Sequence, residues 1–169
     1  VAMPTACKVS ELLNLPYFVS SEIATICNQK NDMRDYLGND FEGNVRYFVS
    51  SNKNDLTAEN LNFFPMMMKP VDSQGQRGVR LVHNVEEVLQ EYDQSMSYSK
   101  IKKVIFEQYL DGPEVSVNSY IYHGEVKFVL VSDRVSFDEY PGGIIKEHHL
   151  PTKESSIVVE RINALVSRV

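Results

Sequence analysis

The feature that most constrains the fold is a polar segment with two glycines that separates two short apolar runs. The runs are Met66–Pro70 and residues 79–82, and the glycines are Gly75 and Gly78. Each run is too short for a helix, and a proline closes the first, so both are expected to be strands. The sequence therefore predicts a glycine-rich hairpin between two antiparallel strands.

This predicted hairpin carries chemistry suited to an anion. Its glycines let backbone N–H groups approach a phosphate closely, Arg77 adds a positive charge, and Lys69 stands on the strand just before it. The two standard phosphate motifs are absent, because no Gly-Lys-Ser/Thr closes the segment and Gly78 leads into a strand, where a dinucleotide fingerprint needs a helix. Two interpretations stay open: a flap that folds over a triphosphate, and a plain hairpin that needs glycine for its turn.

The rest of the chain mixes helical and strand patterns, which predicts an α+β fold. Helices are expected at residues 6–13, at 22–37 with a corner near Asn31, after a cap at Asp55, after the capping box of Asn84 and Glu87, and from Ser156. The helix after Asn84 is expected to bury Val85, Val88, Leu89 and Tyr92. Strands are expected at 45–49, 103–110, 114–122 and 125–131, the last three as a meander, with a turn at 123–124 and a loop at 141–143.

Composition narrows the class of protein. The chain has 169 residues, of which 43% are hydrophobic and 24% charged, and this balance is ordinary for a globular protein. The formal net charge of -6 disfavours nucleic acid as the main partner, since binding to a phosphate backbone needs a basic surface. No apolar run approaches the roughly 18 residues of a membrane span, so no membrane association is expected. Cys7 and Cys27 are too far apart for a Cys-x-x-Cys pair, which favours a reducing, cytoplasmic compartment.

A resemblance to a known family rests on several segments in a fixed order. They are Phe64-Pro65-Met66-Met67-Met68-Lys69-Pro70, the glycine segment up to Gly78-Val79, the capped helix, and Ile105-Phe106-Glu107-Gln108-Tyr109-Leu110-Asp111-Gly112-Pro113-Glu114. Together they resemble the nucleotide-binding part of the ATP-grasp superfamily, closest to its carboxylate-amine ligase, carbamoyl phosphate synthase and biotin carboxylase branches. The resemblance runs from about Lys30 to the C-terminus. It implies two α+β subdomains, with mainly antiparallel sheets and flanking helices, that hold ATP between them.

The resemblance implies contacts to the phosphates of ATP. Lys69 would lie over the α-phosphate and the N7 side of adenine, and Lys30, at the corner between two helices, would be a second phosphate contact. The loop would cover the β- and γ-phosphates with Ser73, Gln74, Gly75, Arg77 and Gly78. Taken alone, Lys69 reads as a strand-end lysine whose amine reaches solvent. The ensemble of lysine, loop and downstream carboxylates favours the nucleotide.

The resemblance also implies contacts to the base and the ribose. Glu107 would accept a hydrogen bond from the adenine amino group, and the backbone of Gln108, Tyr109 and Leu110 would meet the ring edge. Glu114 would accept hydrogen bonds from the ribose hydroxyls, because a carboxylate can accept two at once. Taken alone, Glu114 reads as a carboxylate at the edge of a strand.

Residues on the substrate side follow from the same resemblance. The stretch 142–151 matches the family's acceptor side, so Arg134, Lys146 and His149 are the candidate substrate contacts. A metal shared by His148 and His149 is not expected, because adjacent residues of an extended segment point to opposite faces. The family's magnesium ligands follow a helix like the one from Ser156. We therefore expect no metal site within this chain and magnesium ligands beyond Val169.

We interpret the sequence as a fragment with a truncated C-terminal part. Residues 1–36 would be the end of a preceding domain and a helical linker, 37–110 the first ATP-grasp subdomain, and 111–169 the start of the second. Because phosphoryl transfer depends on the metal, this fragment is expected not to turn over ATP alone.

The expected function is ATP binding within a ligase that activates a small-molecule carboxylate as an acyl phosphate for attack by an amine. One alternative is a piece of a biotin carboxylase or carbamoyl phosphate synthase, for which the carboxylate is bicarbonate. Another is a nucleotide-binding or interaction domain without catalysis. The identity of the carboxylate, the acceptor and the oligomeric state do not follow from the sequence.

Overall fold

Three short helices open the chain. They are α1 (Met3–Leu12), α2 (Ser21–Asn28) and α3 (Lys30–Leu37). The Ser20 side chain accepts a hydrogen bond from the backbone N–H of Ile23 and so caps α2. Gln29 is extended and separates α2 from α3, two residues before the corner expected at Asn31. Gly38, with a φ of 74°, ends α3 in a backbone conformation that favours glycine.

A four-stranded antiparallel sheet follows, and it confirms the predicted glycine hairpin. Its strands are β1 (Tyr47–Ser50), β2 (Met66–Pro70), β3 (Arg80–Val82) and β4 (Val104–Gln108), in the order β1-β4-β2-β3. The segment 71–78 joins β2 to its antiparallel neighbour β3. The helix expected after Asp55 is absent, since Asp55 instead ends a single 3-10 turn, Lys53–Asp55, that Asn52 caps.

The hydrophobic core lies between this sheet and α4 (Val85–Ser97). Asn84 caps α4 as expected: its side chain accepts a hydrogen bond from the Glu87 backbone and donates one to the Glu87 carboxylate, both at 2.9 Å. The core members that lie on these strands and on α4 are Met66, Met68, Val82, Val88, Tyr92, Val104 and Phe106, and Leu56 and Leu61 join them. Leu89 was expected among them, yet it is 40% exposed, because the buried stripe of α4 is narrower than the apolar pattern.

A second sheet is formed by β5 (Glu114–Tyr122), β6 (Glu125–Ser136) and β7 (Ile145–His149), and α5 (Ser156–Val166) contacts β6. The turn between β5 and β6 has positive φ at His123 and Gly124, as a tight hairpin needs. The predicted meander is wrong, because β4 pairs in the first sheet and β7, which was not predicted, supplies the third strand here. Strand β6 also continues five residues past its expected end at Val131.

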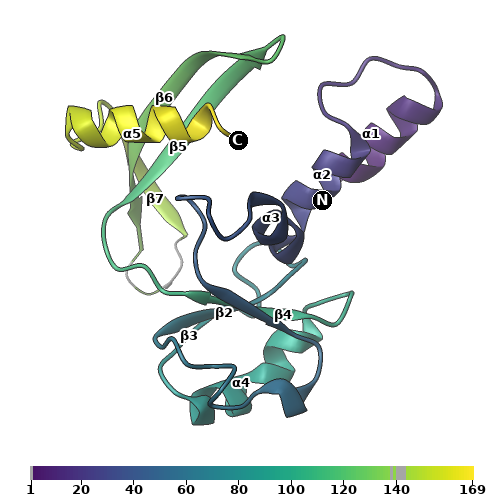
Figure 1. Cartoon of the computed structure of the whole chain (residues 1–169), viewed down its shortest axis with the longest axis vertical. Coiled ribbons are helices and arrows are strands. Elements are labelled where there is room, and N and C mark those ends of the chain that lie inside the picture. The colour runs from purple at the N-terminus through teal and green to yellow at the C-terminus, as the bar shows by residue number, and fades with distance from the viewer. Residues whose placement is uncertain (1, 138, 140–143) are drawn as a thin grey trace. The chain divides into compact units, whose positions relative to one another are not determined.

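The chain divides into two compact units, residues 1–109 and 110–169 (Figure 1). This computed structural model describes residues 2–137, 139 and 144–169. The loop expected at 141–143 lies outside the described residues. Residues 1–36 cluster with the first unit, and their origin in a preceding domain stays a prediction. In the described part of the chain, no helix has both the length and the hydrophobicity to cross a membrane.

Candidate nucleotide site

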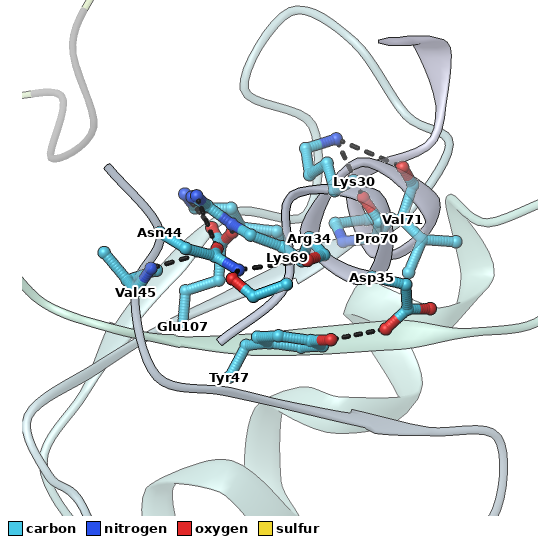
Figure 2. Close-up of polar contacts among 11 residues, drawn as sticks. Lys30, Arg34, Asp35, Asn44, Val45, Tyr47, Lys69, Pro70, Val71 and Glu107 are labelled. Carbon is cyan, nitrogen blue, oxygen red and sulfur yellow. Dashed lines mark hydrogen bonds and ion pairs between the residues drawn. The ribbon is translucent and has the colours of Figure 1, made fainter. Parts of the chain in front are cut away.

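Four charged side chains converge on the face of the first sheet opposite α4. Helix α3 lies along this face and contributes Lys30 and Arg34, β2 contributes Lys69, and β4 contributes Glu107 (Figure 2). The Glu107 carboxylate is divided between two cations, since Oε1 accepts from Arg34 Nε at 2.7 Å and Oε2 accepts from Lys69 Nζ at 2.6 Å. Three cations and one carboxylate leave this cluster with a surplus of positive charge, which suits an anion.

Because Glu107 is buried, its ionisation depends on the neighbouring cations. The Glu107 side chain is 5% exposed, and burial by itself raises its pKa. The Lys69 ammonium and the Arg34 guanidinium outweigh that effect, so the pKa of Glu107 lies below its ordinary value. Glu107 therefore stays a carboxylate at neutral pH and can only accept hydrogen bonds.

Lys30 joins α3 to the start of the glycine loop. Its Nζ donates to the carbonyl oxygens of Ser73 at 2.9 Å and Pro70 at 3.1 Å, and it lies 3.5 Å from that of Val71. Burial and the nearby Lys69 ammonium lower the pKa of Lys30, while Glu107 and Asp72 act in the opposite direction. The ammonium thus stands close to Lys69 and to the loop, as a contact to a polyphosphate requires.

The two glycines of the loop have different surroundings. Both have positive φ, 69° at Gly75 and 73° at Gly78. A Cβ at Gly75 would meet no atom within 4 Å, whereas one at Gly78 would lie 2.8 Å from the Tyr98 ring and 2.9 Å from Pro70. The Gly78 carbonyl also accepts a hydrogen bond from Ser95 Oγ at 2.8 Å. The loop is therefore packed at Gly78 and open at its tip, where Gln74 and Arg77 are also exposed.

The segment expected to meet the base follows β4 directly. The Gln108 backbone N–H donates to Arg46 O at 2.9 Å, and the Tyr109 N–H donates to Pro65 O at 3.1 Å. Two of the three N–H groups expected at the ring edge are thus already bonded within the sheet. Beside them lies a cavity of about 380 Å³, where Phe63, Pro65 and Tyr109 are lining residues. A larger hollow of about 750 Å³ has lining residues from β1 and α3, and among them are Asn44, which bonds Arg34, and Tyr47, which lies opposite Glu107.

The amino-acid sequence of this chain matches a known protein family. The family model described as "Carbamoyl-phosphate synthase L chain, ATP binding domain" matches residues 29–136, more than half of the chain. The chain belongs to this ATP-grasp family. The match begins one residue before Lys30 and includes Lys69, the glycine loop and Glu107. No curated protein sequence matches the chain.

Solved structures share the fold of this ATP-grasp domain. D-alanyl-alanine synthetase A from Vibrio cholerae has a TM-score of 0.80 at 14% identity, and the match covers 97% of this chain and 52% of that one. An L-amino acid ligase from Bacillus licheniformis has a TM-score of 0.76 at 22% identity, covering 98% and 38%. Phosphoribosylglycinamide synthetase from Anaerococcus prevotii has a TM-score of 0.68 at 20% identity, covering 98% and 41%. The ATP-grasp chain thus spans about half the length of these proteins or less.

The second unit holds the remaining candidates. Glu114 Oε2 lies 3.3 Å from Arg134 Nε across the β5–β6 register, so these two residues, expected in separate roles, form one ion pair. Glu147 lies 3.7 Å from Lys146 Nζ and accepts from His149 Nε2 at 2.6 Å. The His149 hydrogen bond and then the Lys146 charge lower the pKa of Glu147. Leu110 is 65% exposed.

The adjacent histidines of β7 have separate partners, as expected for an extended segment. His148 Nδ1 lies 3.2 Å from Ser132 Oγ, whereas His149 bonds Glu147. Among residues 2–137, 139 and 144–169, no group of three or more His, Cys, Asp or Glu side chains could hold a metal ion.

Sequence reasoning missed one residue of the cluster, Arg34, and the residue that holds it, Asn44. Arg34 bonds Glu107, and its Nη1 donates to Asn44 Oδ1 at 3.2 Å. The sequence does contain a signal for Arg34: it stands four residues after Lys30 and therefore lies on the same face of a helix. Asn44 lies in an irregular segment, where no period predicts its direction.

Proposed function

We propose that this chain is the ATP-binding portion of a ligase that activates a carboxylate. The observation that carries the proposal is the cationic cluster of Lys30, Arg34 and Lys69 around the buried Glu107, at the start of a glycine loop in a chain of the ATP-grasp family. An ammonium is a sound point-charge partner for phosphate, and a buried carboxylate is a sound acceptor for an exocyclic amine.

In this proposal Lys69 and Lys30 bind the phosphates, and the loop covers them with the half-buried Ser73 and the exposed Gln74, Gly75 and Arg77. Gly78 anchors the end of that loop against α4. Lys69 must exchange its bond to Glu107 for a phosphate oxygen, which is a favourable exchange for an ammonium because the nucleotide brings several negative charges.

The base contacts become more specific than the sequence alone allows. Glu107 accepts from the adenine amino group. Since the N–H groups of Gln108 and Tyr109 are already bonded, the backbone N–H offered to the ring nitrogen is that of Leu110. Glu114 accepts from the ribose hydroxyls after sharing or releasing Arg134, and Arg134, Lys146 and His149 remain the candidates on the substrate side.

The reaction proposed for the whole enzyme has two steps. A carboxylate oxygen attacks the γ-phosphorus of ATP, ADP leaves, and an acyl phosphate forms. An amine then attacks the acyl carbon, and inorganic phosphate leaves with the former carboxylate oxygen. Magnesium, when bound, neutralises charge on the β- and γ-phosphates. Activity of this chain alone is not expected, and a phosphate-release assay with and without magnesium tests that prediction.

Calorimetric titration tests nucleotide binding directly. ATP, ADP and GTP are titrated with magnesium into the wild-type chain, Lys69→Met and the control Lys53→Met, whose lysine forms an exposed pair with Asp93. Loss of one hydrogen bond to a charged group costs about 1.5–3 kcal/mol, so Lys69→Met should bind ATP about 10- to 100-fold more weakly. Lys53→Met should bind as the wild type does. Equal affinity of all three proteins for ATP would contradict the proposal.

The alternatives make different demands on the carboxylate. A bicarbonate-dependent enzyme of the biotin carboxylase or carbamoyl phosphate synthase kind would form carboxyphosphate, whereas an amino-acid or peptide ligase forms an acyl phosphate that hydroxylamine traps as a hydroxamate. A non-catalytic domain would bind nucleotide without either product. The cytoplasmic location, the absence of nucleic-acid partners and the small carboxylate substrate stay predictions.

A further inference from the structure

Arg34 is held at both ends of its guanidinium. Nε donates to Glu107 at 2.7 Å and Nη1 donates to Asn44 at 3.2 Å, and the side chain is 16% exposed. Asn44 is itself fixed, because its Nδ2 donates to the carbonyl oxygens of Arg34 and Gly38 at 3.0 and 2.9 Å. The guanidinium therefore has one orientation relative to α3, and that orientation points Nε at Glu107 (Figure 2).

Lys69, the second partner of Glu107, is also the proposed phosphate contact. If Lys69 turns to a phosphate, Oε2 of Glu107 loses the bond that it now has, and Arg34 is left as the cation in direct contact. A carboxylate that is 5% exposed and has no cation beside it would take up a proton, because burial disfavours the charged form. A contact that does not depend on Lys69 is thus needed to keep Glu107 an acceptor.

We propose that Arg34 is a positioning residue that keeps Glu107 ionised and turned toward the base, and thereby sets the preference for a 6-amino purine over a 6-oxo purine. This inference rests on the proposed function, since it assumes that Glu107 meets the adenine amino group. Arg suits this place better than Lys because its planar fork bonds Glu107 and Asn44 at once, which a single ammonium does less well.

Removing Arg34 changes what Glu107 can recognise. Besides Arg34, the charged and titratable groups around Glu107 are Lys30 of α3, Lys69 of β2, and Tyr47 of β1, which lies opposite Glu107 and bonds Asp35. When Lys69 engages phosphate in a variant that lacks Arg34, no direct partner is left. Glu107 then takes a proton at a higher pH and, as a carboxylic acid, donates to a 6-carbonyl group as readily as it accepts from a 6-amino group.

The experiment compares ATP with inosine triphosphate, in which a carbonyl group replaces the 6-amino group and the neighbouring N1 carries a hydrogen. Both are titrated, with magnesium and at pH about 6 and about 8, into the wild type, Arg34→Gln, Arg34→Lys and the control Arg80→Gln. Arg80 is a matched control because its Nε also bonds a glutamate, Glu91 at 3.0 Å, on the exposed edge of the sheet. Inorganic tripolyphosphate, which has no base, reports phosphate binding separately.

The wild type and Arg80→Gln should prefer ATP about tenfold or more, because opposing acceptors leave one of them unpaired. In Arg34→Gln this ratio should fall at both pH values and reach about twofold at the lower pH, without inverting, because the N1–H of the 6-oxo purine still opposes the Leu110 N–H. The affinity for tripolyphosphate should not fall by a similar factor at either pH. Arg34→Lys should restore part of the ratio, to about one third of the wild-type value, because it keeps the charge and loses the fork.

The outcomes distinguish a failure of the role of Arg34 from a failure of the proposed function. A wild-type ATP preference in Arg34→Gln, at both pH values, would overturn the role of Arg34 and leave the proposed function standing. Should Arg34→Gln fail to fold, Arg34→Lys decides in its place, and an unchanged ratio there would overturn the role equally. If the wild type binds neither tripolyphosphate nor nucleotide, the proposed function is contradicted, and the inference is overturned with it.

Discussion

The two faces of the first sheet are built from the same strands and have opposite chemistry. Toward α4, Met66 and Met68 of β2 and Phe106 of β4 form a core that excludes water. Toward α3, Lys69 of β2 and Glu107 of β4 form an ion pair that Arg34 completes. Phe106 and Glu107 are neighbours in the sequence, and side chains of a strand alternate between faces.

The comparison teaches how a small domain supports buried charge. Phe106, the core residue next to Glu107, fixes the backbone of the strand and so keeps Glu107 rigid. The same packing shields the Glu107 carboxylate from solvent. A site on a strand is held more firmly than a site on a loop, and Lys69 and Glu107 both lie on strands, whereas residues 71–78 form a loop. The core face should therefore respond to substitution in stability, and the α3 face in binding and pH dependence.

The largest expected effect is on the core face. Phe106→Ala removes a ring that stacks near Phe48 and Tyr92, with centroids 6.1 and 6.5 Å away, and truncation of a buried Phe costs about 3–5 kcal/mol. Glu107→Gln, one residue away, should cost clearly less. Urea unfolding followed by circular dichroism measures both. Equal losses for the two variants would contradict the division of the sheet into a core face and a site face.

The second effect compares the two ends of the glycine loop. Gly78→Ala combines a positive φ with a collision against Tyr98 and Pro70 and should lose about 2–4 kcal/mol of stability. Gly75→Ala, with the same sign of φ and open space around it, should lose about 1–2 kcal/mol from backbone strain alone. Thermal unfolding of the two variants provides the comparison, and a reversed order would place the packed end of the loop at the tip.

The third effect is the pH dependence that the α3 face adds to stability. Because the folded-state pKa of Glu107 lies below its ordinary value of 4.5, its contribution is fully present above that pH and is lost as the pH falls through the lowered value. The difference in unfolding free energy between wild type and Glu107→Gln should shrink from pH about 6 to about 3. A difference that grows over this range would mean that burial, and not the two cations, dominates the pKa.

The smallest effect is in local dynamics. Residues 74–77 at the loop tip should exchange their amide hydrogens rapidly without nucleotide. Val71 should exchange more slowly, because it is buried and its N–H donates to Lys103 O at 3.2 Å. Hydrogen exchange read by mass spectrometry should show added protection at the tip when ATP is bound. Strong protection of the tip in the free chain would argue for the plain hairpin over a flap.

Local signals predicted the first unit well. Pro70, the glycines and the Asn84 cap each determine a backbone conformation within a few residues, and β2, the hairpin and α4 were predicted from them. The nucleotide residues of this unit came from the resemblance, while the ion pairs that join Lys69 and Arg34 to Glu107 depend on the order β1-β4-β2, which no local pattern contains.

Non-local pairing explains what was missed. Nothing in the run from Val104 to Tyr122 says that Asp111-Gly112-Pro113 separates two sheets, so a meander was predicted where the chain changes sheets. Strand β7 consists mostly of charged and histidine residues and lacks the apolar alternation that predicts a strand, although its partner β6 is the strand directly before it. The Glu114 and Arg134 pair is likewise a product of register, 20 positions apart in sequence and opposite one another in the sheet.

The alternation of Phe106 and Glu107 also limits how this sequence can change in length. Deleting or inserting a single residue within Val104–Gln108 would exchange the two faces of the strand, and would turn a phenylalanine toward the cations and a carboxylate into the core. No substitution elsewhere compensates for both errors at once. Length variation among related chains should therefore fall in the loops that flank β4, such as residues 98–103 before it and 110–113 after it, and leave the strand itself uninterrupted.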